Sequence, residues 1–305
     1  MLAIKLNQFG GVDALKEATV DRPAPSAKQV LIENHAVAID PYDVKFVMGL
    51  MGEGDKLPLI PGSSIVGEVV AVGADVTDFK VGERVAANRH HQTYAEYVPV
   101  GQSALAKVPD TISDATAVAS VLGAATGYQM ILVDLNVQAG EKVLIQGGSG
   151  SVGSVAIQAA LNRGAEVYAT SSAAHFDYLQ SLGDVHPIDY HTDYENDLSN
   201  FDAVLDTVGG ATTVKSAQVL KTGGRLVNLS SDPQLEELSQ RFSIDAKASY
   251  LAGKGALLSE LLADIAADRI TIKIADTKPF NQENLQADHA LMRAESPVGK
   301  LILEF

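Results

Sequence analysis

The segment Gly147–Gly153 constrains the fold of this chain more than any other. It reads Gly-Gly-Ser-Gly-Ser-Val-Gly, and its last six residues satisfy the pattern G-x-G-x-x-G. The mainly apolar run Lys142–Gln146 precedes it and predicts a buried strand, and Val152–Arg163 follows with its apolar residues on one helical face. A strand, a tight glycine turn and a helix begin a βαβ unit. The pattern therefore predicts a parallel sheet covered by helices.

The same glycines predict a dinucleotide site. They permit a tight turn and a close approach of the backbone, so that N–H groups at the start of the helix can bind a pyrophosphate. A glycine-rich turn with a purely structural role is the alternative, but the strand before it and the helix after it favour the dinucleotide. The motif glycines that we assign to this site are Gly148, Gly150 and Gly153.

The end of the next predicted strand, Glu166–Thr170, bears on the choice of cofactor. Proteins that prefer NAD usually present an Asp or Glu to the ribose hydroxyls there. This chain instead has Ser171, Ser172 and His175, and its first carboxylate is Asp177. Nothing repels a 2′-phosphate and the hydroxyls could donate to it, which favours NADP(H). Two points weigh against this: the segment has no Lys or Arg, and the serines could simply form a loop and cap a helix.

Charge and composition restrict the partners. The 305 residues carry 23 Lys and Arg against 38 Asp and Glu, and a net charge of −15 argues against nucleic acid or an anionic membrane as a partner. The chain has no cysteine, which excludes disulfides and zinc sites with thiolate ligands and favours a reducing compartment. We therefore expect small-molecule partners or a second copy of the chain.

Two apolar segments bear on the location of the protein. The N-terminus alternates like a strand and does not resemble a signal peptide. The uncharged run Ala115–Val133 is long enough to span a membrane, but its polar residues and its acidic flanks predict a buried helix pair instead. We expect a cytoplasmic protein.

The pattern of elements divides the chain into three segments. Residues 1–113 consist of short strands separated by glycine and proline turns, which predicts a mostly β, barrel-like domain. Residues 114–252 alternate strands with helices, as expected of a doubly wound parallel sheet. Residues 253–305 begin with an amphipathic helix and end in two strand-like segments, Ile270–Ile274 and Lys300–Phe305. These last segments resemble the first domain, so we expect an α/β protein whose β-rich domain is formed from both ends of the chain.

Further motifs extend over nearly the whole chain. They are Phe9-Gly10-Gly11, Asp40–Lys45, Pro61-Gly62-Ser63, Val81–Val85, Tyr94–Tyr97, Ile188-Asp189-Tyr190, Asp206–Gly209 and Gly299-Lys300-Leu301. With the glycine loop, they make the chain resemble the zinc-free quinone oxidoreductase branch of the medium-chain dehydrogenase/reductase superfamily. The resemblance implies a GroES-like catalytic domain made from both termini, a Rossmann domain between them, an active site in the cleft, and a homodimer.

The resemblance also implies cofactor contacts. The backbone of Gly150, Ser151 and Val152 would face the pyrophosphate, Asp40 and Thr126 would lie near the nicotinamide, Val208 would line the nicotinamide ribose, and Tyr190 would lie near the phosphate of the adenosine ribose. Two positions depart from the family pattern. Many relatives have Asn in place of Asp40, and many have a basic residue in place of His191, which weakens the expected phosphate clamp.

The chemistry follows from a missing zinc ligand. Zinc-dependent relatives have a Gly-His-Glu motif where this chain has Gly62-Ser63-Ser64. Without a Lewis acid, hydride transfer needs an acceptor that spreads charge by itself, such as a quinone or an α,β-unsaturated carbonyl compound. The resemblance places Tyr42 and Lys45 near the cleft as candidate proton donor or oxygen stabiliser, and a role in cofactor contact or at the surface is equally open.

Two further points concern a possible metal site and the class of function. The pair His90-His91 suggests a metal site, but adjacent side chains point apart and no carboxylate pattern surrounds them, so we interpret the pair as part of a surface loop and expect no metal. A dinucleotide-binding protein with little turnover, such as a redox sensor or a structural protein, is the alternative function.

Overall fold

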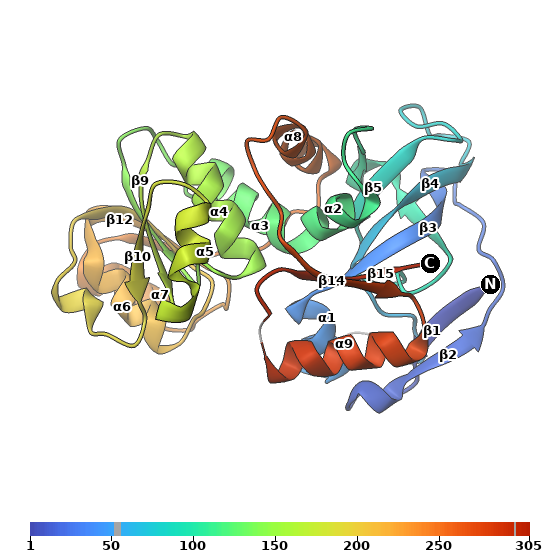
Figure 1. The fold of residues 1–305 in the computed structure, drawn as a ribbon, viewed down its shortest axis with the longest axis horizontal. Helices are drawn as coiled ribbons and strands as arrows, with labels where there is room; N and C mark the ends of the chain where they lie inside the picture. The colour runs from blue at the N-terminus through green and yellow to red at the C-terminus, as the bar shows by residue number, and fades with distance from the viewer. Residues whose placement is uncertain (52–55, 296) are drawn as a thin grey trace. The chain divides into compact units, whose positions relative to one another are not determined.

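The computed structural model of the protein describes residues 1–51, 56–295 and 297–305. The chain forms two compact units (Figure 1). We call residues 1–123, 253–267 and 272–305 the β-rich unit, and residues 124–252 and 268–271 the parallel-sheet unit. Both ends of the chain therefore belong to one unit, and the segment with the glycine loop forms the other.

A seven-stranded sheet forms the centre of the β-rich unit. The last strand of the chain pairs antiparallel with a strand near its start, with Leu301 opposite Ile39, which joins the C-terminal segment to the N-terminal one. The third strand is long and mostly buried, and its Val30 and Ile32, which share one face, are fully buried in the core. The spatial order is β14 (Ile274–Pro279), β15 (Lys300–Glu304), β3 (Gln29–Ile39), β4 (Ser64–Val72), β5 (Arg84–Asn88) and β7 (Leu105–Lys107), with β6 (Tyr97–Gly101) paired to β3.

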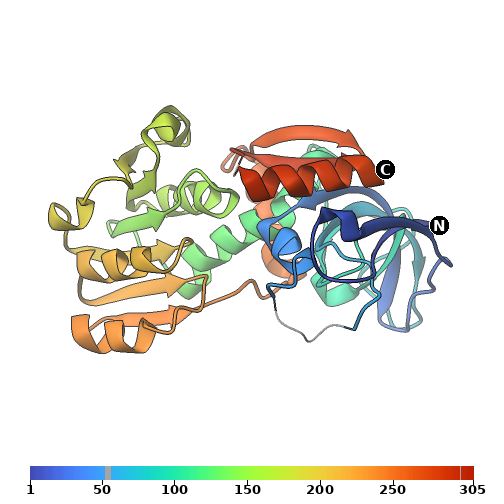
Figure 2. The same cartoon turned by 90° about the horizontal axis from the view of Figure 1, so that it is seen from below.

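Two further strands and four helices, one of them α2 (Asp114–Ala119), belong to the described part of the β-rich unit. Helix α9 packs against α1, β2 and β15, as Figure 2 shows for its red ribbon. Its Leu285 is fully buried with Ile4, Leu6 and Leu301, which explains the apolar side of this helix. The other elements are β1 (Leu2–Leu6), β2 (Leu15–Thr19), α1 (Pro41–Val47), α8 (Gly255–Ala266) and α9 (Gln282–Ala294), with short 3-10 turns at Val12–Ala14 and Gln102–Ala104.

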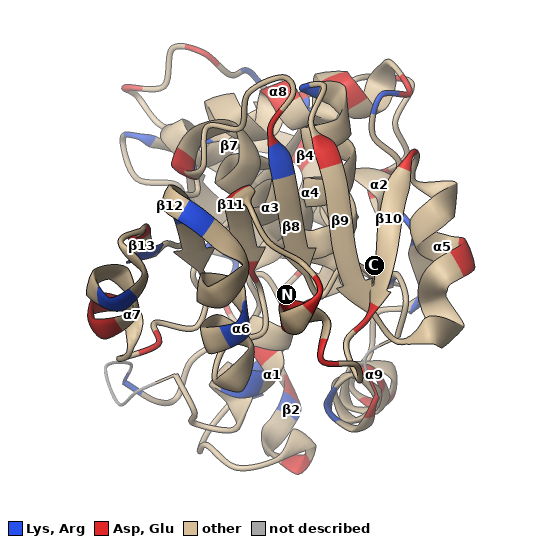
Figure 3. Cartoon of the chain, turned by 90° about the vertical axis from the view of Figure 1, so that its left-hand side faces the viewer, with Lys and Arg blue, Asp and Glu red and all other residues tan. Residues whose placement is uncertain are grey.

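The parallel-sheet unit has six strands, all parallel (Figure 3). The chain runs outward from β8 through β9 to β10, and then returns to the other side of β8 with β11. The strand order therefore reverses between β8 and β11, where α/β sheets bind their ligands. In space the strands are β10 (Val185–Asp189), β9 (Glu166–Ser171), β8 (Lys142–Gln146), β11 (Phe201–Asp206), β12 (Leu220–Asn228) and β13 (Asp245–Ala248).

Helices connect these strands. The helix that begins at the glycine loop lies very close to the helix that contains Gly127. A Cβ on Gly127 would lie 2.2 Å from the carbonyl oxygen of Val152, so only glycine fits there. The helices are α3 (Ala125–Gln129), α4 (Ser151–Asn162), α5 (Phe176–Ser181), α6 (Ala211–Val219) and α7 (Leu235–Phe242), with 3-10 turns at Ala173–His175 and Tyr194–Asn196. The predicted fold class, a doubly wound parallel sheet plus a mostly β domain, is confirmed.

The predicted helix pair at Ala115–Val133 is wrong in one respect. The structure has one continuous helical run, Asp114–Asp134, which consists of α2 (Asp114–Ala119), α3 and two π-helical segments, Ser120–Ala124 and Met130–Asp134. By length and composition alone this run is apolar enough to cross a membrane. However, 72% of its apolar window is buried inside the protein, and core helices pass the same test.

The predicted strand Ile270–Ile274 is also wrong, because β14 begins only at Ile274. The side chain of Gln158 on α4 satisfies the preceding backbone. Its Oε1 accepts from the Thr271 N–H at 2.7 Å, and its Nε2 donates to the Thr271 carbonyl at 3.0 Å. A backbone whose polar groups are bonded to a side chain has no need of a neighbouring strand.

Candidate functional site

The glycine loop is the turn that joins β8 to α4. Two of its positions accept only glycine. Gly147 has φ +72°, and a Cβ on Gly153 would lie 2.3 Å from the Gly147 carbonyl oxygen. At Gly150, by contrast, a Cβ would meet only the Gly147 oxygen, at 3.5 Å. Gly150 is the N-cap of α4 and has no side chain to cap the amides of Ser151 and Val152. The loop therefore fits an anion such as a pyrophosphate at the positive end of the helix.

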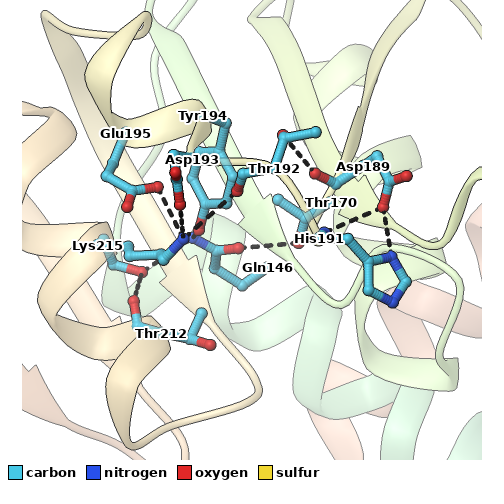
Figure 4. Close-up of polar contacts among 11 residues, drawn as sticks. Gln146, Thr170, Asp189, His191, Thr192, Asp193, Tyr194, Glu195, Thr212 and Lys215 are labelled. Carbon is cyan, nitrogen blue, oxygen red and sulfur yellow. Dashed lines mark hydrogen bonds and ion pairs between the residues drawn. The ribbon is translucent and has the colours of Figure 1, made fainter.

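A buried side chain at the end of β8 holds this loop in place. Oε1 of Gln146 accepts from the Thr170 hydroxyl at 2.8 Å, and that hydroxyl accepts from the Gly147 N–H at 3.0 Å. The Thr170 carbonyl accepts from the Gly148 N–H at 2.8 Å. On its other side Gln146 donates to the Tyr194 hydroxyl at 2.8 Å (Figure 4). The loop is thus tied to the neighbouring strand β9 and, through Gln146, to the 3-10 turn Tyr194–Asn196.

Val208, which was predicted to line the nicotinamide ribose, lies on the β11 side of the point where the strand order reverses. The turn after β11 carries Val208, whose side chain is 56% exposed. The Thr207 hydroxyl donates to the Gln146 carbonyl at 2.8 Å, and a Cβ on Gly147 would lie 3.4 Å from Cγ2 of Val208. The structure therefore brings Val208 beside the glycine loop. Thr126 is buried on α3, next to the residue at which this helix contacts α4.

A set of polar side chains gathers at the end of β9. Nδ1 of His175 lies 3.2 Å from Oγ of Ser149 and 3.5 Å from Oγ of Ser172. Ser171 is buried, and its carbonyl accepts from the Tyr190 N–H at 3.1 Å, while the Tyr190 side chain is 53% exposed. The sequence-based assignment included four of these residues but missed Ser149. Its place inside the motif was the available signal.

His191, at the position where many relatives have a basic residue, is bonded within its own turn. Its Nδ1 lies 2.7 Å from Oδ1 of Asp189, which also accepts from the His191 N–H at 3.0 Å (Figure 4). These bonds, first that of the backbone N–H and then that of the ring, lower the pKa of Asp189. Nearby, Nζ of Lys215 pairs with Glu195 at 2.9 Å. The side chains of His191 and Lys215 thus both have carboxylate partners of this chain.

In the β-rich unit the predicted residue Asp40 lies at the start of α1 in a buried polar cluster. Asp40 forms an ion pair with Lys300, and its N–H donates to Oδ2 of Asp43 at 3.1 Å. All three side chains are buried. Burial, and then the charge of Asp40, raise the pKa of Asp43 to about 7. The carboxylate of Asp40 therefore has a buried lysine as its counter-ion.

Tyr42 and Lys45 lie on α1, with Tyr42 half-buried and Lys45 exposed. The Tyr42 hydroxyl is 2.7 Å from Nδ1 of His90. The ring of His91 lies 4.2 Å from that of Phe46 in the core. His90 and His91 lie in a loop, with His90 exposed, in agreement with the interpretation of the pair as a surface loop. The sequence did not indicate that both rings contact α1 and that His90 bonds a candidate catalytic residue.

Comparisons with known proteins agree with this architecture. The profile described as "Alcohol dehydrogenase GroES-like domain" matches residues 26–138, and the profile described as "Zinc-binding dehydrogenase" matches residues 182–303. The "2-methylene-furan-3-one reductase" of Solanum lycopersicum is 31% identical over 317 residues, covering 99% of this chain and 79% of the relative. The structure of the quinone oxidoreductase from Coxiella burnetii superposes with a TM-score of 0.92 at 28% identity, covering 100% of this chain and 99% of that one.

The chain belongs to the quinone oxidoreductase branch of the medium-chain dehydrogenase/reductase superfamily. Members of this superfamily are oxidoreductases that bind a nicotinamide dinucleotide, and the glycine loop, the turn after β11 and the end of β9 fit such a cofactor. A further relative, the "NADPH-dependent alkenal/one oxidoreductase, chloroplastic" of Arabidopsis thaliana, is 35% identical over 243 residues, covering 75% of this chain and 62% of that protein.

The zinc site named in one of the matching profiles does not fit the residues of this medium-chain dehydrogenase/reductase. Ser64 lies where zinc-dependent members have a glutamate, and its hydroxyl donates to the Ala38 carbonyl at 3.2 Å, between two strands. Ser63 is buried beside it. Among residues 1–51, 56–295 and 297–305, no group of three or more His, Asp or Glu side chains could hold a metal ion.

Proposed function

We propose that this protein reduces quinones or α,β-unsaturated carbonyl compounds with NADPH as the hydride donor. The observation that carries this proposal is the glycine loop with its uncapped helix, together with the acid-free set of Ser149, Ser172 and His175 at the end of β9. The uncapped helix supports the binding of a pyrophosphate. The acid-free set supports the binding of a phosphate on the adenosine ribose.

The end of β9 favours NADPH over NADH for a physical reason. Two hydroxyls and an imidazole are hydrogen-bond donors to a phosphate, and no carboxylate of that segment opposes it before Asp177. His191 does not add a free cation, because it bonds Asp189. We therefore assign the recognition of the 2′-phosphate to Ser149, Ser171, Ser172 and His175, with Tyr190 beside the adenosine.

The acceptor class follows from the residues at Ser63 and Ser64. Neither is a zinc ligand, so a carbonyl would not be polarised by a metal at this position. Quinones and enones accept a hydride because they spread the resulting charge over a conjugated system. Relatives named as a quinone oxidoreductase, an alkenal/one oxidoreductase and a 2-methylene-furan-3-one reductase support the same class.

The residues of the chain have defined tasks in this mechanism. When bound, NADPH supplies the hydride. The amides of Gly150, Ser151 and Val152 hold the pyrophosphate, and Val208 and Thr126 contact the nicotinamide half. The Tyr42 hydroxyl donates the proton that completes the reduction, and it is reprotonated from solvent through His90, which is exposed and whose Nδ1 it contacts. Lys45 stabilises the developing negative charge on the substrate oxygen.

The experiment is a rate measurement with the purified full chain. NADPH oxidation is followed with a panel of quinones and enals, and NADH is compared under the same conditions. We expect turnover with at least one acceptor and a lower Michaelis constant for NADPH. Tight binding of NADPH with no oxidation across the panel would instead support a redox-sensing or structural role. Lys45→Ala tests the oxygen stabiliser: unchanged turnover and unchanged cofactor affinity would remove Lys45 from the site.

We infer three further properties of the same protein. The net charge of −15 and the absence of cysteine support a cytoplasmic protein with small-molecule partners. Membership of the quinone oxidoreductase branch supports a homodimer, which light scattering of the purified chain would test directly. The domain division at residues 113 and 252 is tested by limited proteolysis.

A further inference from the structure

Asp206 is a fully buried carboxylate at the end of β11 whose two oxygens each accept two hydrogen bonds. Oδ1 accepts from the N–H groups of Val208 and Gly209, both at 2.9 Å. Oδ2 accepts from the Thr213 hydroxyl at 2.7 Å and from Nδ2 of Asn228 at 2.9 Å. Thr213 lies in the first turn of α6, where the helix dipole favours a negative charge. Four donors and a helix N-terminus therefore compensate the burial of this carboxylate.

These bonds determine the shape of the turn 207–210. Two consecutive amides point at one oxygen, and Gly209 adopts φ +86°, which favours glycine. A Cβ on Gly209 would lie 2.3 Å from Oγ of Ser230, and Ser230 is itself bonded to Oδ1 of Asn228 at 2.8 Å. The turn therefore packs against a second buried polar group. Its conformation follows from Asp206 and Asn228 together.

The same turn exposes an apolar side chain. The Val208 N–H is held by the buried carboxylate while its side chain is 56% exposed. The neighbouring Thr207 hydroxyl ties the turn to the carbonyl of Gln146 at the end of β8. The turn that carries this exposed valine is firmly held, and it lies beside the glycine loop where the strand order reverses. Val208 is therefore placed to contact a ligand rather than to fill the core.

We propose that Asp206 is a positioning residue for the nicotinamide half of the cofactor. It holds the turn 207–210 so that Val208 faces the dinucleotide across from the glycine loop, and it does not contact the cofactor itself. This inference rests on the binding of a nicotinamide dinucleotide and deepens the proposed function. The adenosine half depends on Ser149, Ser172 and His175, which Asp206 does not contact.

The test separates the two halves of the cofactor. In Asp206→Asn the new amide N–H₂ faces the N–H₂ of Asn228, so one bond becomes a contact between two donors. We expect binding of NADPH to weaken about tenfold, as for the loss of one charge-assisted hydrogen bond. Binding of adenosine 2′,5′-bisphosphate, which fills only the adenosine half, should stay within about twofold.

The swapped variant Asp206→Asn/Asn228→Asp is the matched rescue. It restores a donor opposite an acceptor, leaves Oδ1 at position 206 for the two amides, and keeps the net charge. We expect NADPH affinity to return to within about threefold of that of the wild-type protein. Thr207→Val removes only the bond to the Gln146 carbonyl, and it should weaken NADPH binding but not bisphosphate binding.

Binding is measured by calorimetry, with unfolding midpoints recorded for each variant. Equal weakening of NADPH and of the bisphosphate in all variants would overturn the proposal and leave Asp206 with a role in folding alone. Unchanged NADPH affinity in Asp206→Asn and Thr207→Val would also overturn it. Because the readout is binding, a wild-type protein that binds NADPH but reduces none of the acceptors would contradict the proposed reaction without affecting this inference.

Discussion

The Tyr42 hydroxyl lies 2.7 Å from Nδ1 of His90, which joins the first turn of α1 to the segment that follows β5. Tyr42 is half-buried and His90 is exposed. A tyrosine that gives up a proton to a substrate must recover one, and an imidazole at hydrogen-bond distance and open to solvent provides the route. This pair is the specific addition that the structure makes to the proposed chemistry.

We predict that Tyr42→Phe lowers kcat for enone reduction by about 10²-fold, the usual contribution of a positioned proton donor, without changing the affinity for NADPH. His90→Gln should also lower kcat, but less, because the variant loses the imidazole that returns a proton to Tyr42 and keeps the Tyr42 hydroxyl itself. Tyr97→Phe is the matched control, since it also removes a tyrosine hydroxyl, one that is bonded to Glu33 at 2.9 Å. Equal kcat values for Tyr42→Phe and the wild type would exclude Tyr42 as the donor.

Gly150→Asp should separate cofactor binding from stability. Position 150 has extended backbone, with φ −76° and ψ 168°, and space for a side chain. An aspartate there caps α4 and occupies the anion site with its own charge, so the protein should be at least as stable while NADPH binding weakens more than about tenfold. Gly150→Ala is the control without charge. An Asp variant that binds NADPH as the Ala variant does would show that the pyrophosphate lies elsewhere.

Ser172→Asp introduces the acid that NAD-preferring proteins carry at the end of this strand. We expect the Michaelis constant for NADPH to rise about tenfold, because the new carboxylate repels the 2′-phosphate, while that for NADH changes little. Ser199→Asp adds the same charge on another exposed loop and serves as the control. The assignment of the 2′-phosphate to this segment would be lost if both Michaelis constants rose together.

The stability of the β-rich unit should depend on pH through Asp43. Its pKa is raised from 3.8 to about 7, so between these values the folded state keeps a proton that the unfolded chain releases, and the free energy of unfolding falls as pH rises through this window. Asp43→Asn does not titrate and can still accept from the Asp40 N–H. Relative to the wild type, we expect this variant to gain about 1 kcal/mol or more between acidic and neutral pH.

Urea unfolding over a pH series measures this effect, and Asp13→Asn, an exposed carboxyl on the same unit, is the control. A stability difference between Asp43→Asn and the wild type that stays constant across the series would show that folding does not raise the pKa of Asp43.

The local sequence pattern was sufficient to predict the glycine loop, the strand before it and the helix after it. Lys142–Gln146 was predicted with the bounds that the structure has, because an apolar run that ends at glycines leaves few alternatives. The segment Ile270–Ile274 shows where pattern fails: its apolar residues suggest a strand, but the Gln158 side chain, more than a hundred residues away in sequence, satisfies its backbone.

The sequence by itself determined the fold class, the anion-binding loop and the absence of an acid at the end of β9, because each depends on residues that are adjacent or regularly spaced. Only the tertiary structure decided which side chains hold those features in place. Gln146 reaches Tyr194, Asp206 reaches Asn228, and Tyr42 reaches His90 across 48, 22 and 48 residues of chain. Hydrogen bonds between polar side chains so far apart in sequence depend on which strand ends, helix starts and loops the fold brings together, and no local spacing encodes that.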